Sequence, residues 1–175
     1  MARFEVLLLK MIGSSMAGNR PAQLNRDELL EAQALAIKLD APMAVYIHYF
    51  FYQASLDCKE LDEAEVHLNE YIQEADAVPE GMRGSVWIEA AFFYANVRKD
   101  LSRASEYFNK YKPSPLIPLA MVYATQAAIA LLKNELTEAG ILVDQSLKEI
   151  PNMMDRGIAH ILQEKLQEMK LQLMQ

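Results

Sequence analysis

The chain has 175 residues, of which 52% are hydrophobic and 23% are charged, with a formal net charge of −7 at pH 7. This length and composition are typical of a soluble domain that can bury a core, and they argue against disorder. Nucleic acids and anionic membrane surfaces attract Lys and Arg, so the excess of acidic residues argues against both as ligands. The abundance of good helix formers argues against an all-β fold.

The first predicted helix has apolar residues at the helical period, namely Phe4, Leu7, Leu8, Met11 and Ile12. Glu5 precedes this apolar run, Lys10 interrupts it, and no cleavage site of small residues follows. We therefore interpret the segment as an amphipathic helix of the mature protein rather than a signal peptide. We expect the helix to end at Gly13 or at Gly18-Asn19.

A second helix is expected after Asn25, whose side chain can cap the helix N-terminus. Its apolar side is predicted to contain Leu29, Leu30, Ala34, Leu35 and Ile37. We expect it to end near Asp40, before a third helix that runs from about Pro42 to Leu56. The third helix contains the aromatic cluster VYIHYFFY at residues 45–52.

Six more helices are predicted, at residues 60–77, 83–98, 100–111, 119–132, 136–150 and 152–173. Residues 113–132 are free of charge over the length of a membrane span. Three prolines occupy the first six of these positions, which leaves a helix too short for the hydrocarbon core. We therefore expect no membrane insertion of this chain.

Three related decamers lie at turns between predicted helices: KELDEAEVHL at 59–68, KDLSRASEYF at 99–108 and NELTEAGILV at 134–143. In each, an acidic residue is expected at the helix start, where the helix dipole favours it: Glu60, Asp100 and Glu135. The alternative N-caps are Asp62, Ser102 and Thr137. We expect Ala64, Ala104 and Ala139 to be buried where paired helices meet, and Leu68, Phe108 and Val143 to fill the space between pairs.

The spacing of these residues resembles the tetratricopeptide repeat, in which an Ala is followed by a bulky apolar residue, a small residue and then a Pro. The third copy fits best, with Ala139, Val143, Ser146 and Pro151. The resemblance implies an all-α, right-handed solenoid of about nine helices in antiparallel pairs. A generic helical bundle is the alternative, but a bundle does not require the same turn chemistry three times.

On this interpretation, residues 1–175 form a single repeat domain. Its parts are N-terminal capping helices at 1–40, repeats at 42–78, 83–113 and 115–151, and a C-terminal capping helix at 152–175.

In tetratricopeptide-like proteins the first helix of each pair lines a concave groove. The resemblance places nine residues there: Tyr46, Tyr49, Gln53, Glu89, Phe93, Asn96, Met121, Thr125 and Ala128. Tyr49 and Phe93 should then be more exposed than Leu68 and Phe108. The alternative is that these side chains fill a tightly wound core. The expected lining has no Lys or Arg, so capture of a C-terminal carboxylate is not expected.

The sequence contains no recognisable catalytic or cofactor-binding motif, and we expect neither cofactor nor metal. His48, His67 and His160 stand far apart in the chain, and none belongs to an HExxH pair or a Cys/His cluster. Cys58 is the only cysteine, which suits a reducing compartment and hence the cytoplasm. We interpret it as a buried structural thiol.

A second resemblance concerns the N-terminal segment RFEVLLLKMIGSSMAGNRPAQL. It is similar to the start of the helical tails carried by some bacterial site-2-type membrane metalloproteases, through Gly18, Arg20 and Pro21. The resemblance implies that the chain is a soluble cytosolic part of a larger protein and holds no catalytic residue itself, because the zinc motif is absent.

The functional hypothesis from the sequence is therefore a non-enzymatic module that binds a protein or peptide partner, and a homodimer remains open. The first alternative is a regulatory or substrate-recruiting part of a larger membrane metalloprotease. The second is a small-molecule sensor, which would show a closed apolar pocket near Tyr49 and Phe93.

Overall fold

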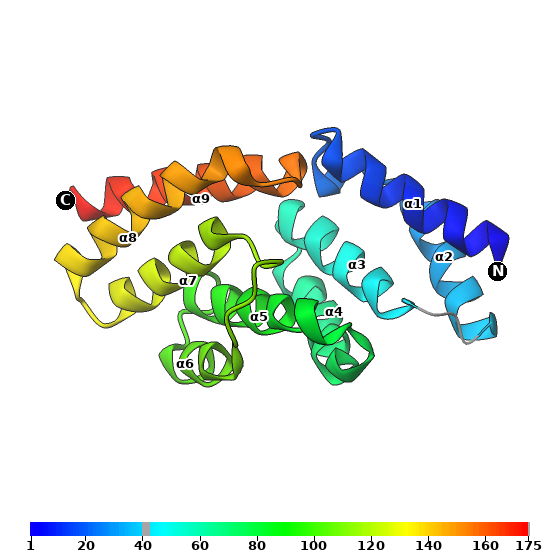
Figure 1. Cartoon of the computed structure of the whole chain (residues 1–175), viewed down its shortest axis with the longest axis horizontal. Helices are drawn as coiled ribbons and strands as arrows, with labels where there is room; N and C mark the ends of the chain where they lie inside the picture. Colours follow the sequence, from blue (N-terminus) through cyan, green and yellow to red (C-terminus); the bar gives the residue numbers. More distant parts are fainter. Residues whose placement is uncertain (40–42, 175) are drawn as a thin grey trace. The chain divides into compact units, whose positions relative to one another are not determined.

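The computed structural model describes residues 1–39 and 43–174, and these residues form nine α-helices and no strand (Figure 1). The helices are α1 (Ala2–Met16), α2 (Arg26–Leu39), α3 (Val45–Asp57), α4 (Leu61–Gln73), α5 (Gly84–Asn96), α6 (Leu101–Lys110), α7 (Leu119–Leu132), α8 (Leu136–Glu149) and α9 (Arg156–Leu173). The prediction of an all-helical protein is confirmed. Among these residues, no helix has both the length and the apolar character that crossing a bilayer requires.

Most predicted helix limits agree with the structure to within two residues. The helix predicted at 60–77 ends at Gln73, and a separate 3₁₀ turn, η2 (Ala75–Ala77), follows it. The last helix begins four residues later than predicted, because the 3₁₀ turn η4 (Ile150–Asn152) contains Pro151 and precedes it. The predicted limits near Asp40 and Pro42 lie outside the described residues.

The three decamers build the same turn between consecutive helices. Each begins with a residue in the left-handed conformation, with φ of 63° at Lys59, 55° at Lys99 and 61° at Asn134. After Lys59, the backbone N–H of Glu60 donates to the Ser55 carbonyl at 2.8 Å, which closes a Schellman-type helix end. The repeated Lys or Asn is therefore the residue that reverses the chain.

The acidic residue that follows is the N-cap of the next helix in all three copies, at Glu60, Asp100 and Glu135. Of these, only the Asp100 side chain caps its helix, since Oδ1 accepts a hydrogen bond from the backbone N–H of Arg103 at 3.0 Å. The alternative N-caps were wrong, because these residues lie inside the helices: Asp62, Ser102 and Thr137.

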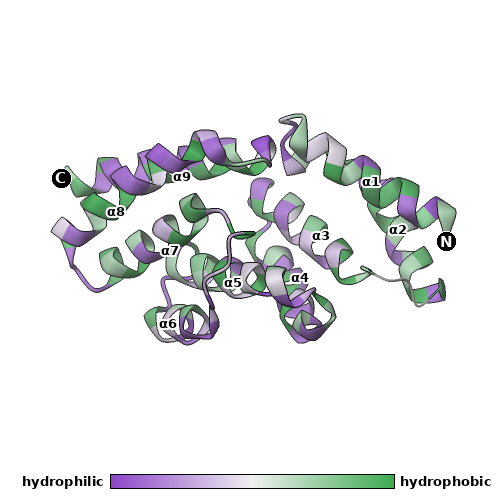
Figure 2. Cartoon of the chain, in the orientation of Figure 1, coloured by the Kyte–Doolittle hydropathy of each residue, from purple (hydrophilic) through white to green (hydrophobic). Residues whose placement is uncertain are grey.

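The chain divides into two compact units. The first contains residues 1–78 and 154–160, and the second contains residues 79–153 and 161–175. Helix α9 therefore contributes its first residues to one unit and the rest to the other, and Figure 2 shows hydrophilic and hydrophobic residues alternating along it.

The first unit is built from α1, α2 and the pair α3–α4. Its core combines Phe4, Leu7, Leu8 and Met11 of α1 with Leu29, Ala32 and Ala36 of α2 and Ile47, Phe50 and Phe51 of α3. The buried face predicted for α1 is thus confirmed, although its fifth predicted residue, Ile12, is only partly buried. The predicted face of α2 was largely wrong: Leu29 is buried, but Leu30 and Ile37 are 49% and 80% exposed. Small residues on α2 form the contact instead.

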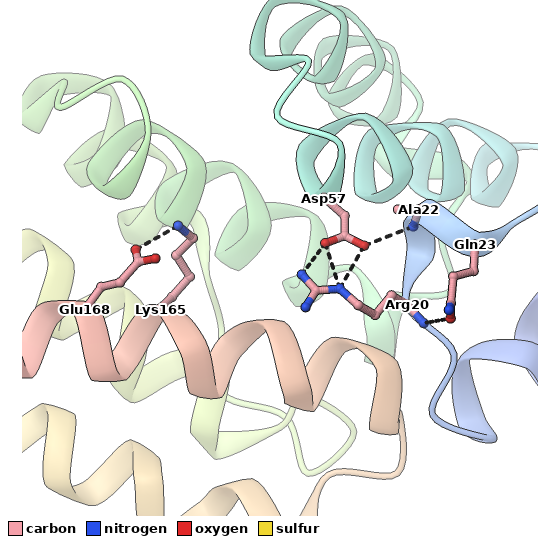
Figure 3. A network of polar contacts seen from close by, with 6 residues as sticks. All are labelled: Arg20, Ala22, Gln23, Asp57, Lys165 and Glu168. Atoms are coloured by element: carbon pink, nitrogen blue, oxygen red, sulfur yellow. Dashed lines mark hydrogen bonds and ion pairs between the residues drawn. The ribbon is translucent and has the colours of Figure 1, made fainter.

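A part-buried ion pair between Arg20 and Asp57 ties the N-terminal turn of the first unit to the end of α3 (Figure 3). The Asp57 carboxylate is only 2% exposed and accepts hydrogen bonds from Nε and Nη2 of the Arg20 guanidinium. It also accepts one from the backbone N–H of Ala22 at 3.0 Å. Gly18 reverses the chain before this turn with φ of 94°. The Gly-x-Arg-Pro segment therefore has a structural role.

The second unit is built from the pairs α5–α6 and α7–α8, with α5 packed against α7. All three repeated alanines of the chain, Ala64, Ala104 and Ala139, are fully buried, as predicted. Across the pair α7–α8, the hydroxyl of the buried Ser146 donates to the Ala120 carbonyl at 2.7 Å. Small residues at these contacts let the helices approach closely.

Candidate functional site

The nine residues predicted to line a groove are mostly inside the protein. Six are buried: Gln53, Glu89, Phe93, Met121, Thr125 and Ala128. Three are half-buried: Tyr46, Tyr49 and Asn96. The first three in chain order belong to the first unit and the other six to the second unit. Whether they line one groove remains a prediction.

Tyr49 and Phe93 were both predicted to be more exposed than Leu68 and Phe108. For Phe93 this prediction is wrong. Phe93 is 0% exposed, like Leu68, and it is more buried than Phe108. Its ring packs edge-on against Tyr94, with ring centroids 5.5 Å apart. Tyr49 is half-buried and packs against Tyr71 at 5.6 Å. Phe93 is therefore a core residue, as the alternative interpretation held.

The second unit contains a cavity of about 510 Å³ that the sequence did not indicate. One wall is the connection between α6 and α7, and the other is the end of α8 with the turn that follows. Its lining residues are Tyr111, Pro113, Ser114, Pro115, Ile117, Pro118, Leu119, Glu149, Asn152 and Met153. The volume falls in the range of ordinary ligand-binding pockets, about 300–1,000 Å³.

The connection at 112–118 is held close to the start of α5. The Ser114 hydroxyl donates to the Gly81 carbonyl at 2.7 Å. A Cβ atom on Gly84 would lie 3.1 Å from the Tyr111 ring and 3.3 Å from the Lys112 carbonyl oxygen. The absence of a side chain at Gly84 thus permits this close approach, which sets the position of one cavity wall.

Prolines make this wall stiff, because each fixes its own φ and lacks a backbone N–H. Ile117 and Met153 supply buried apolar surface, and Leu119 at the start of α7 is 50% exposed. On the opposite wall the Asn152 amide donates to the Glu149 carboxylate at 2.9 Å. The cavity thus offers an apolar interior beside one carboxylate, which suits an apolar side chain next to a cationic or amide group.

The lone cysteine is exposed, so its interpretation as a buried thiol was wrong. Cys58 is the residue after α3 and lies beside Asp57 and Glu60. Desolvation raises the pKa of its thiol, and the two neighbouring carboxylates raise it further. A raised pKa leaves less thiolate at neutral pH, which disfavours a nucleophilic role.

Comparison of the chain with protein-family models, with curated proteins and with solved structures finds no match.

Proposed function

We propose that the chain is a non-enzymatic interaction module that binds a peptide segment of a protein partner in the cavity of its second unit. The observation that carries the proposal is the apolar, proline-walled cavity with the half-exposed Leu119 in its lining. A stiff, preformed wall reduces the conformational entropy that binding would otherwise lose.

The scaffold that we propose for this module is a tetratricopeptide-like solenoid of antiparallel pairs. Its support is the turn that recurs at Lys59, Lys99 and Asn134, together with a fully buried alanine in the helix that follows each turn. Repeats of this kind commonly present surfaces to extended or helical peptides.

The chemistry of the cavity favours a partner segment with an apolar anchor next to Lys or Arg. Glu149 supplies the local negative charge, and the net charge of −7 favours approach of a basic segment. Neither Tyr49 nor Phe93 lines this cavity, so it does not support the small-molecule sensor in the form expected from the sequence. The metalloprotease-tail alternative gains no support either, because Gly18 and Arg20 have local structural roles.

A random peptide library displayed on phage tests the proposal directly. We expect selection on the intact chain to enrich peptides that combine an apolar anchor with basic residues. Leu119→Glu should weaken their binding at least tenfold. Leu136→Glu is the matched control, because Leu136 also begins a helix and is 51% exposed but does not line the cavity. No enrichment, or equal loss in both variants, would refute the proposal.

A further inference from the structure

Two histidines that are 19 positions apart in the sequence converge in the first unit. The ring centroids of His48 on α3 and His67 on α4 lie 6.5 Å apart. Between them stands Glu70, whose Oε2 lies 2.9 Å from Nδ1 of His48 and 2.9 Å from Nδ1 of His67. We expected no metal site because these histidines stand far apart in the sequence, and folding removes that separation.

We propose that His48, His67 and Glu70 form a binding site for one Zn²⁺ ion. The three residues each offer a ligand atom, and these atoms all lie within 4.8 Å of one another. Neighbouring ligands of a tetrahedral zinc ion, at bond lengths of about 2.0–2.1 Å, are about 3.3 Å apart. The two contacts at 2.9 Å need to open by about 0.4 Å, and the two histidine nitrogens, which lie within 4.8 Å of one another, need to reach about the same separation. The Glu70 side chain is 41% exposed, so its position can adjust.

The His48 contact has the length of a hydrogen bond but not its direction. Nδ1 of His48 is buried and makes no hydrogen bond, although Glu70 Oε2 lies 2.9 Å away. An ion about 2.05 Å from both atoms would stand about 45° from the Nδ1–Oε2 line. An N–H that points toward such an ion would miss the oxygen as a hydrogen-bond acceptor. The missing hydrogen bond at this short distance agrees with such an orientation of the His48 ring.

Carboxylates also stand near the outer nitrogens of both rings. Nε2 of His48 lies 3.6 Å from Glu74 Oε1, and Nε2 of His67 lies 3.8 Å from Glu63 Oε1. At these distances the two carboxylates form no hydrogen bond, but they lie where the outer partners of metal-bound histidines stand. Nδ1 of His67 is hydrogen-bonded to Glu70 Oε2 at 2.9 Å, and a bound zinc ion would take the place of the proton between them.

The ligand set selects among metals. Two imidazoles and one carboxylate suit Zn²⁺, whereas Ca²⁺ and Mg²⁺ prefer oxygen ligands alone. Phe51 stacks on the His67 ring at 4.7 Å and holds its orientation. Both histidine side chains keep some exposure, 17% and 14%, which leaves a route for the ion. A bound ion would link α3 to α4 and stabilise the folded first unit.

The test is zinc titration of the untagged full chain, by calorimetry and by competition with a fluorescent chelator. We expect one equivalent to bind with a dissociation constant in the micromolar range or below. Co²⁺ should give the visible absorption of a tetrahedral site, and Ca²⁺ and Mg²⁺ should not compete. At 100 µM ZnCl₂, we expect the melting temperature to rise by about 5 °C.

Three near-isosteric variants remove the ligands: His48→Gln, His67→Gln and Glu70→Gln. Each should weaken zinc binding at least tenfold while circular dichroism shows unchanged helix content. His160→Ala and Cys58→Ser are the controls, because both residues are exposed and lie outside the cluster, and both variants should bind as the parent does. Binding no tighter than 100 µM, or binding lost equally in the controls, would overturn the proposal. If a glutamine variant loses helix content, the Co²⁺ spectrum of the parent chain decides: octahedral Co²⁺ would overturn the site.

Discussion

The ion pair between Arg20 and Asp57 should be the most sensitive polar contact of the first unit. Arg20→Ala removes the guanidinium and leaves the Asp57 carboxylate, which is 2% exposed, with the hydrogen bond from the Ala22 N–H. Breaking a fully buried pair in this way costs about 3–5 kcal/mol. The Arg20 side chain is 39% exposed, so water can partly replace it, and we expect a loss of about 2–3 kcal/mol.

Urea denaturation of the full chain, followed by far-UV circular dichroism, measures this loss. With a denaturant slope of about 2 kcal/mol/M, the midpoint should fall by about 1–1.5 M. In a double-mutant cycle with Asp57→Ala, the double variant should be less destabilised than the sum of the single variants by at least about 1 kcal/mol. Arg3→Ala is the matched control: Arg3 forms two hydrogen bonds of 2.8 Å with Glu31, but both side chains are exposed. We expect no resolvable midpoint change there, and equal shifts for Arg3→Ala and Arg20→Ala would refute the reasoning.

The remaining predictions concern a buried alanine, two helix N-caps and the cysteine. Ala104→Leu should overpack a site with no exposure and destabilise the chain by about 1–3 kcal/mol, and an unchanged urea midpoint would show that the alanine has no packing role. Asp100→Ala should cost about 1 kcal/mol through loss of the helix cap, whereas Glu135→Ala, where no such bond exists, should leave the midpoint nearly unchanged. Cys58 should react with iodoacetamide at pH 8 more slowly in the folded chain than in urea, because the raised pKa of the folded-state thiol lowers the thiolate fraction; faster reaction on folding would contradict this.

The helices and their turns were largely determined by the sequence alone. Apolar residues at the helical period predicted α1 and its buried face, since that pattern acts within one element. The repeated decamers predicted the three buried alanines and the acidic residue at each helix start. Their opening Lys or Asn could not be identified as left-handed, because no glycine marks these turns.

Only the tertiary structure decided which faces and side chains meet. On α2 the larger apolar residues, Leu30 and Ile37, face solvent, because the neighbouring helix packs against the alanine side. Phe93 was expected in a groove and is fully buried. His48 and His67 approach one another because α3 and α4 pack as a pair. The repeat pattern predicted this pairing, but it did not predict which side chains meet across it. The spacing of Glu63, His67 and Glu70 places these three side chains on one face of α4. Only the tertiary structure shows that His48 of α3 lies against this face.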